Sequence, residues 1–284
     1  MNPRGAAGAA WRPYPGGALP DARGELLEHR PVGGVGIPAR PFWLYAPAGA
    51  ALRERRPLLV LLDGQNLFDD RAAFAGRSWR IAAALDAFEG EPGGAPWVVG
   101  VANAGRRRIR EYAPFRDRRF GGGGARLTLR FLLAEVVPRV ARAVAVARRR
   151  DGEPALGVGG SSLGGSFALW ALFASRGAFE RVLAMSPTTR FAGEALRGYL
   201  RRQRHRAARL YLDCGLAEGR RRGLRFRPAA PSAYVRRVRR LSRALEEIGY
   251  VRGRDLVHVE APGGEHTEHD WGARFPGALA ALYG

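Results

Sequence analysis

The chain has 284 residues and a formal net charge of +21, and all of its basic residues apart from five histidines are arginines. Its single cysteine, Cys214, excludes an internal disulfide and a multi-cysteine zinc site. No apolar run reaches the length that spans a membrane. Arginine without lysine indicates coding bias, and no nucleic-acid-binding motif accompanies the charge, so we expect no specific nucleic-acid function.

Residues 1–23 are rich in Gly, Pro and Ala and predict a flexible N-terminal arm. The first twenty residues lack the apolar core of a secretion signal, which together with the lone cysteine indicates the cytoplasm. No linker separates two cores in the remainder. We therefore expect residues 24–284 to form a single domain.

Apolar patterns predict the order of strands along the chain. Residues 24–32 and 40–47 are typical of an antiparallel pair at a sheet edge. Continuous apolar runs that end in turns predict six strands buried on both faces, over 57–64, 96–103, 155–162, 181–187, 209–215 and 255–263.

Helical patterns lie between these strands, at 77–88, 127–150, 163–174, 232–248 and 271–282. Pro138 is expected to kink the second of them or end its first part. Strands that alternate with helices predict an α/β fold with a mostly parallel sheet covered on both faces. The least regular segments are 121–124, 188–208 and 219–231, and the last two are candidates for a lid or pocket wall.

The segment from Gly160 to Gly164 reads Gly-Ser-Ser-Leu-Gly and fits the G-x-S-x-G pattern between an apolar strand and an apolar helix. The tight turn strains the central residue and needs small neighbours, so that the hydroxyl projects at the start of the helix. Ser162 is therefore predicted to be the nucleophile of an α/β-hydrolase fold. The alternative is a Gly/Ser-rich turn without catalysis.

A serine nucleophile needs a base and an acid, which follow it in the order acid, then histidine, in this fold. His266 is the favoured base because the Gly-Gly turn before it can return an imidazole to the serine, with His269 as the alternative. The acid should follow the strand at 209–215. Glu218 in the loop is favoured, and Asp213 within the strand is the alternative.

Two backbone N–H groups are expected to stabilise the oxyanion of the intermediate. One is the N–H of Leu163, directly after the nucleophile, and the other is the N–H of Gln65, in the turn after the strand at 57–64.

Together these segments resemble the esterase D, or putative esterase, family of α/β-hydrolases, which includes enterochelin-type esterases, feruloyl esterases and S-formylglutathione hydrolases. The resemblance covers about residues 40–283 and rests on LLVLLDGQNLFDD, VVGVANAGRRRIREYAPF, GVGGSSLGGSFALWALF, FERVLAMSP, LYLDCGLAEG and GGEHTEHDW. It implies the same triad, Ser162, His266 and Glu218, and the same oxyanion donor, Gln65.

The resemblance also implies that the R-x-x-E-Y-x-P segment shapes or braces the pocket. On this basis we predict substrate-binding roles for Arg108 and Tyr112 of that segment, and for Trp271, five residues after His266. Many relatives have Asp as the acid and a Thr after the preceding glycine, whereas here Leu216 and Ala217 precede Glu218.

The sequence thus predicts a serine esterase that acts through an acyl-enzyme and uses no cofactor or metal. Its expected partner is a small-molecule ester, anionic or aromatic in character because arginines lie near the pocket. An acyltransferase on the same scaffold is the first alternative. A non-catalytic basic binding protein is the second, and it predicts a broken triad.

Overall fold

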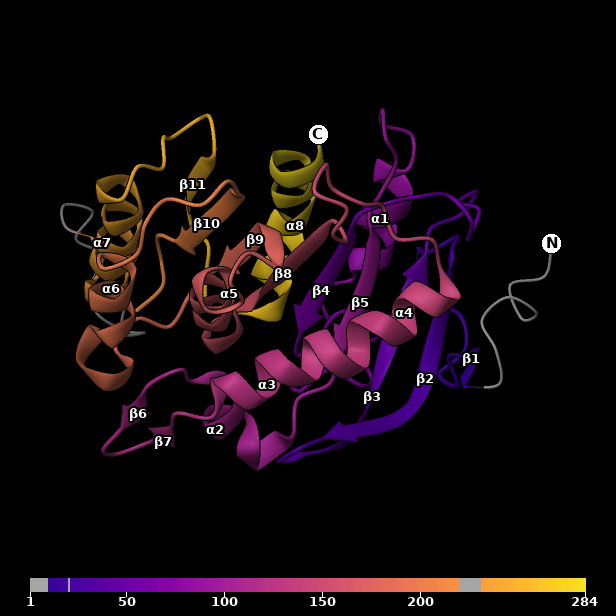
Figure 1. Cartoon of the computed structure of the whole chain (residues 1–284), viewed down its shortest axis with the longest axis horizontal. Coiled ribbons are helices and arrows are strands. Elements are labelled where there is room, and N and C mark those ends of the chain that lie inside the picture. The colour runs from indigo at the N-terminus through magenta and orange to yellow at the C-terminus, as the bar shows by residue number, and fades with distance from the viewer. Residues whose placement is uncertain (1–9, 20, 220–230) are drawn as a thin grey trace.

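A nine-stranded sheet forms the centre of the molecule (Figure 1). The computed structural model describes residues 10–19, 21–219 and 231–284. The strands lie side by side in the order β1 (Trp11–Pro13), β2 (Glu25–Gly34), β3 (Ile37–Ala46), β5 (Trp97–Val101), β4 (Leu58–Leu62), β8 (Leu156–Ser161), β9 (Phe179–Met185), β10 (Arg209–Gly215) and β11 (Leu256–Ala261).

The first three strands are antiparallel to their neighbours, and β3 is also antiparallel to β5. From β5 to β11 every neighbouring pair is parallel. All five residues of β4 and of β5 are buried, as expected of strands covered on both faces. The mostly parallel α/β sheet predicted from the sequence is confirmed.

Helices cover both faces of the sheet (Figure 1). One face packs against α3 (Ala125–Phe131), α4 (Val137–Ala143), α5 (Leu163–Ala174) and α7 (Ala233–Glu247), and the other against α1 (Ile81–Phe88) and α8 (Glu268–Tyr283). Strand β4 contributes side chains to the core on both faces of the sheet. Leu58 and Val60 lie in the core under α3, α4, α5 and α7, and Leu59 and Leu61 lie in the core under α1 and α8.

The smaller elements lie in the connections. They are α2 (Arg108–Tyr112), α6 (Ala195–Leu200), the hairpin strands β6 (Arg116–Asp117) and β7 (Gly121–Gly122), the 3₁₀ turns η2 (Gly64–Asn66), η3 (Gly105–Arg107) and η5 (Phe191–Glu194), and the π-helical turn η4 (Leu132–Val136).

Several sequence-based boundaries need correction. The flexible arm expected over 1–23 is wrong for Trp11–Pro13, which pair with β2. The helix expected over 127–150 ends at Ala143, and the π-helical turn η4 comes just before Pro138, which has no N–H for helical bonding. Helix α1 begins only at Ile81, because Arg80 has a φ of 52°.

The two lid candidates have different outcomes. The 188–208 stretch contains α6, whose apolar side is buried against the core through Leu196 and Leu200. The second candidate, 219–231, lies almost entirely outside the described residues, which resume at Pro231.

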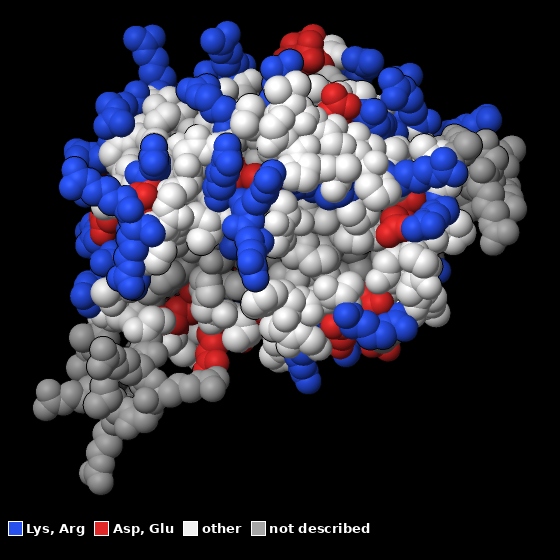
Figure 2. Space-filling view, turned by 90° about the horizontal axis from the view of Figure 1, so that it is seen from below, with Lys and Arg blue, Asp and Glu red and all other residues white. Residues whose placement is uncertain are grey.

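Arginines are spread over the face of the molecule that Figure 2 shows. Figure 2 shows them over most of one face, with acidic side chains and uncharged surface between them. The Arg40–Glu111 pair is an exception, since both side chains are about 95% buried and joined by hydrogen bonds of 2.6 and 3.0 Å. No helix among residues 10–19, 21–219 and 231–284 is long and apolar enough to cross a membrane.

We predict that Cys214 is unreactive in the folded protein. Its side chain is fully buried in β10, and burial, with Glu218 nearby, raises the pKa of the thiol to about 12. Ellman's reagent should therefore give no thionitrobenzoate from the native protein and one equivalent in guanidinium chloride. Rapid labelling of the native protein would contradict this burial.

Candidate active site

The three predicted catalytic residues follow three parallel strands. Ser162 comes directly after β8, Glu218 three residues after β10 and His266 five residues after β11. The carboxyl ends of parallel strands meet at one edge of a sheet, where open α/β sheets bind their ligands. The fold therefore brings three segments that are distant in sequence to one edge.

The Ser162 turn is strained, as G-x-S-x-G requires. Ser162 has φ 54° and ψ −118°, and α5 begins at the next residue. Its N–H donates to the Met185 carbonyl of β9 at 2.9 Å, which ties the turn to the sheet. A Cβ on Gly160 would lie 3.2 Å from the backbone of Gly164, a tight contact, so glycine favours the close approach of the strand and the helix.

The Ser162 hydroxyl lies beside a second hydroxyl. Its Oγ is 2.9 Å from Thr188 Oγ1, in the loop after β9. Thr188 lines a cavity of about 400 Å³ together with Glu218 and His266. The serine, through Thr188, therefore borders the same space as the histidine and the acid.

His266 and Glu218 form a direct pair. Nδ1 of His266 lies 2.7 Å from Glu218 Oε2, and the imidazole side chain is 35% exposed while the carboxylate is fully covered. Burial alone would raise the pKa of Glu218, but hydrogen bonds from His266, Ser186 and the Gly215 N–H hold it below its usual value. An ionised Glu218 keeps the proton on Nδ1 and leaves Nε2 as an acceptor.

Two glycines let the acid loop and the histidine loop touch. A Cβ on Gly215 would lie 2.0 Å from the carbonyl oxygen of Gly264, so no other residue fits there without movement of the chain. The same carbonyl accepts a hydrogen bond from the Ala217 N–H at 3.0 Å. The Gly-Gly turn noted in the sequence thus provides close packing as well as a change of direction.

Behind Glu218 lies a buried polar network that the sequence reasoning missed. Ser186 donates through its hydroxyl to Glu218 Oε1 at 2.5 Å and accepts from Arg274 Nη2 at 2.9 Å. Arg274 also donates through Nε to Asp213 Oδ2 at 2.7 Å. Arg274, on α8, therefore connects the catalytic acid candidate with its alternative.

Asp213 faces this network and not the imidazole. It is fully buried, and its carboxylate accepts hydrogen bonds from Arg274, from the Ser186 N–H at 2.8 Å and from the Tyr211 hydroxyl at 3.2 Å. Burial raises the pKa of Asp213, and the charge of Arg274 opposes that rise. These contacts support a structural role for Asp213 and favour Glu218 as the partner of His266.

The other four histidines make contacts with residues other than Ser162 and Glu218. His29 stacks on Phe42, His205 pairs with Asp255, His258 lies buried in β11, and His269, the alternative base, contacts Arg77 Nη1 through Nδ1 at 3.4 Å.

The turn after β4 contains Gln65, whose N–H is the predicted oxyanion donor. Asp63 has a φ of 57°, and the hydrogen bonds of η2 run from the Asn66 and Leu67 N–H groups to the carbonyls of Asp63 and Gly64. These bonds do not use the N–H of Gln65. The N–H of Leu163 is likewise in the first turn of α5, where a helix offers no internal acceptor.

Two of the predicted substrate-binding residues lie beneath this turn. Arg108 donates to both carboxylate oxygens of Asp63, at 2.7 and 2.6 Å. The Tyr112 hydroxyl accepts a hydrogen bond from the Asp63 N–H at 3.2 Å. In this position both residues brace the turn that contains Gln65, and from the same segment Ile109 lines the cavity.

The third, Trp271, packs against His266, the predicted base. Its ring meets the His266 ring edge to face, with centroids 4.8 Å apart, and 5% of the residue is exposed. Tyr234 of α7 makes a second edge contact with the imidazole at 5.5 Å. Trp271 and Tyr234 therefore limit the orientations that the imidazole can adopt.

The cavity in front of His266 is mostly apolar. Ile109, Phe120 and Phe191 form its apolar wall, and the Phe120 and Phe191 rings lie 5.6 Å apart. Arg190 is the only arginine among its described lining residues.

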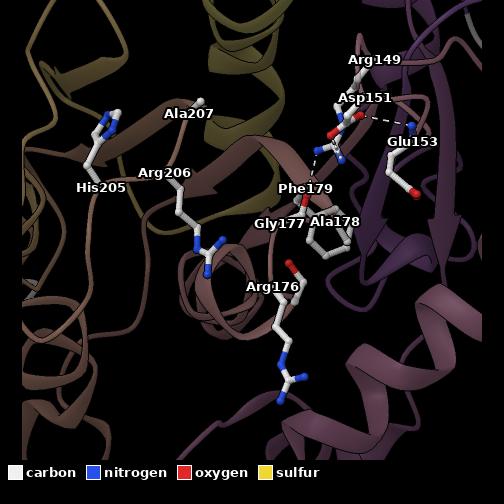
Figure 3. A pocket seen from close by; sticks show the side chains of 11 residues that line it. Arg149, Asp151, Glu153, Arg176, Gly177, Ala178, Phe179, His205, Arg206 and Ala207 are labelled. Carbon is white, nitrogen blue, oxygen red and sulfur yellow. Dashed lines mark hydrogen bonds and ion pairs between the residues drawn. The ribbon is translucent and has the colours of Figure 1, made fainter.

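A second hollow, of about 690 Å³, lies at the opposite edge of the sheet. It is lined by residues just before β9 and β10, and Figure 3 shows Arg149, Arg176 and Arg206 around it, with His205 apart from them. The Arg149 guanidinium forms an ion pair with Asp151 and donates a hydrogen bond to the Gly177 carbonyl. Because these are the amino ends of the strands, this hollow is not the catalytic cavity.

Comparisons with known proteins give a family and a fold. A family model described as "Putative esterase" matches residues 39–282. The BES protein from Bacillus cereus is similar in structure, with a TM-score of 0.68 and 19% identity over 91% of this chain and 95% of that one. The siderophore hydrolase EstA from Aspergillus nidulans gives a TM-score of 0.62 and 20% identity over 93% and 94%.

The enterobactin esterase FES from Shigella flexneri, in the presence of 2,3-di-hydroxy-N-benzoyl-serine, also has a similar fold. Its TM-score is 0.62 and its identity 20%, over 89% of this chain and 58% of that one. A search of curated protein sequences gives no match.

We predict that Arg274→Met strongly destabilises the fold. Removing one partner of a buried ion pair leaves the other charge without compensation and costs about 3–5 kcal/mol. Asp213 would be left in this state, because its side chain is fully covered. The free energy of unfolding in urea measures the loss.

Arg201→Met is the matched control. Arg201 pairs with Glu247 at the surface, where both side chains are about half exposed, and exposed pairs contribute roughly 0–1 kcal/mol. Equal losses in the two variants would contradict the importance of the Arg274 network.

Proposed function

Because the chain belongs to the Putative esterase family and is a carboxylic ester hydrolase, we propose that it cleaves its substrate through an acyl-enzyme formed on Ser162. His266 is the general base, and Glu218 orients it. The observation that supports this most directly is the 2.7 Å contact between His266 Nδ1 and the buried Glu218 carboxylate, at the cavity that Thr188 links to the strained serine.

The reaction proceeds in two halves. Ser162 Oγ bonds to the ester carbonyl carbon while its proton passes to Nε2 of His266, and the alcohol then leaves with that proton. A water molecule gives a proton to the same nitrogen and attacks the acyl carbon. The bond from this carbon to Oγ then breaks, and the proton returns to Ser162 as the acid is released.

The oxyanion formed in each half is bound by the N–H groups of Gln65 and Leu163. Neither N–H is used by the backbone turn in which it lies. Arg108 and Tyr112 hold the Asp63 turn, so they act on the oxyanion site by fixing its backbone. Donors that are fixed beforehand need no reorganisation when charge develops.

The substrate proposed is a small ester with an apolar or aromatic acyl group. The walls from Ile109, Phe120 and Phe191 suit such a group, and Arg190 beside them suits an anionic substituent. Solved structures of similar fold include a siderophore hydrolase and an enterobactin esterase, which agrees with this class of ester.

We also propose that residues 24–284 belong to one catalytic domain, to whose sheet β1 (Trp11–Pro13) adds an edge strand. All three triad positions, and the Gln65 turn, follow strands of the same nine-stranded sheet.

Ser162 should be the only residue that a fluorophosphonate labels. We expect wild-type protein to hydrolyse p-nitrophenyl acetate and to gain one phosphonyl adduct by intact mass. Ser162→Ala should gain none and lose activity by about 10⁶-fold, as when other serine hydrolases lose their nucleophile. Adjacent Ser161, which is buried, provides the control variant Ser161→Ala. Wild-type protein that neither turns over nor is labelled would contradict the proposal.

Glu218→Gln should lower kcat by roughly 10⁴-fold, because an amide in place of the acid favours the wrong tautomer of the base. Asp213→Asn should lose much less kcat per folded molecule, since Asp213 contacts Arg274 and not the imidazole. Active-site titration corrects both rates for folded protein. The reverse order of the two losses would identify Asp213 as the acid.

A further inference from the structure

The loop after β9 holds a hydroxyl against the nucleophile for which the triad gives no role. Thr188 Oγ1 lies 2.9 Å from Ser162 Oγ, and Thr188 also lines the cavity that contains His266. We propose that Thr188 is a further catalytic residue, which donates its hydroxyl hydrogen to Ser162 and thereby directs the serine proton to His266. This rests on the proposed function, because it gives Thr188 a task in the attack by Ser162.

The position of Thr188 is fixed by contacts with the nucleophile's own turn. Its N–H donates to the Ser162 carbonyl at 3.0 Å, and its carbonyl accepts from the Ser166 hydroxyl, one turn into α5, at 2.6 Å. Both backbone groups of Thr188 are thus tied to this turn, which keeps the residue beside Ser162.

The same segment is also fixed from the histidine side. The Tyr234 hydroxyl donates to the carbonyls of Ser186 and Pro187, and the Tyr234 ring contacts the His266 ring. Thr188 is thus positioned by the residues that position the base. An incidental contact would not need anchors on both sides of the site.

The direction of the hydrogen bond follows from the number of protons available. Glu218 holds the His266 proton on Nδ1, so Nε2 can only accept. Ser162 has a single hydroxyl hydrogen, which must point to Nε2 when the serine attacks. The bond to Thr188 can persist in that arrangement only if Thr188 is the donor.

This role predicts an asymmetry between the two halves of the reaction. The Thr188 bond orients a free serine hydroxyl, which exists only before acylation. In the acyl-enzyme Ser162 Oγ is an ester oxygen with no proton to direct. Loss of the Thr188 hydroxyl should therefore slow the attack by Ser162 and spare the hydrolysis of the acyl-enzyme.

Thr188→Val tests this, because valine keeps the shape of threonine and removes the hydroxyl. We expect the rate constant for fluorophosphonate labelling to fall by about tenfold, the effect of one lost hydrogen bond. The decay of isolated acetyl-enzyme, followed by intact mass, should match that of wild type. Thr188→Ser should recover most of the labelling rate.

Thr189→Val is the matched control. Thr189 is the next residue and is buried, whereas Thr188 is half-buried, and the Thr189 hydroxyl has no hydrogen-bond partner among the described residues. It should label at the wild-type rate. A Thr188→Val protein that labels as fast as wild type or faster, or whose acyl-enzyme decay slows as much as its labelling, would overturn the role of Thr188.

Wild-type protein separates this inference from the proposed function. If wild type is labelled and forms an acyl-enzyme while Thr188→Val is unchanged, only the role of Thr188 fails. If wild type forms neither adduct, the acyl-enzyme mechanism itself fails.

Discussion

The site depends on one buried carboxylate. Glu218 is 2% exposed, and an ionised group at that depth is stable only if its oxygens are hydrogen-bonded. Its partners are His266 and Ser186, from the loops after β11 and β9, and the N–H of Gly215, the last residue of β10 between them. Satisfying the charge therefore determines how these loops lie relative to one another, and the position of the imidazole follows.

The sequence was most informative where the determining physics is local. Strands such as β4 and β8 are buried on both faces, so they appear as unbroken apolar runs. The Ser162 turn needs its glycines and serines within five consecutive residues, which makes it visible as a motif. The family resemblance, confirmed by the family model, and the order of acid and histidine along the chain then pointed to Glu218 and His266.

It was least informative where a residue acts through distant partners. Thr188, Ser186 and Arg274 are single polar residues in the sequence, and nothing local distinguishes Arg274 from the many other arginines. Their contacts join segments up to 88 residues apart. Strand β1 was missed for a similar reason, since a three-residue strand is defined by its pairing with β2 and not by its own pattern.

Backbone strain at the carboxyl edge of the sheet occurs at the same place after three of the strands. The residues directly after β4, β8 and β9 are Asp63, Ser162 and Ser186, and all three have positive φ, of 57°, 54° and 43°. Such conformations cost roughly 1–3 kcal/mol each and persist only where the surroundings fix them.

For two of these residues, the fixing bond continues the sheet. The Ser162 N–H donates to the last residue of β9, and the Ser186 N–H donates to the Asp213 carbonyl of β10 at 3.2 Å. The segment after β8 therefore stays paired with β9 for one more residue, and the segment after β9 stays paired with β10 for one more residue. Each segment then turns away sharply. This abrupt change leaves the hydroxyls of Ser162 and Ser186 facing the neighbouring loops, so the strain is the direct cost of presenting polar groups at the edge of an apolar sheet.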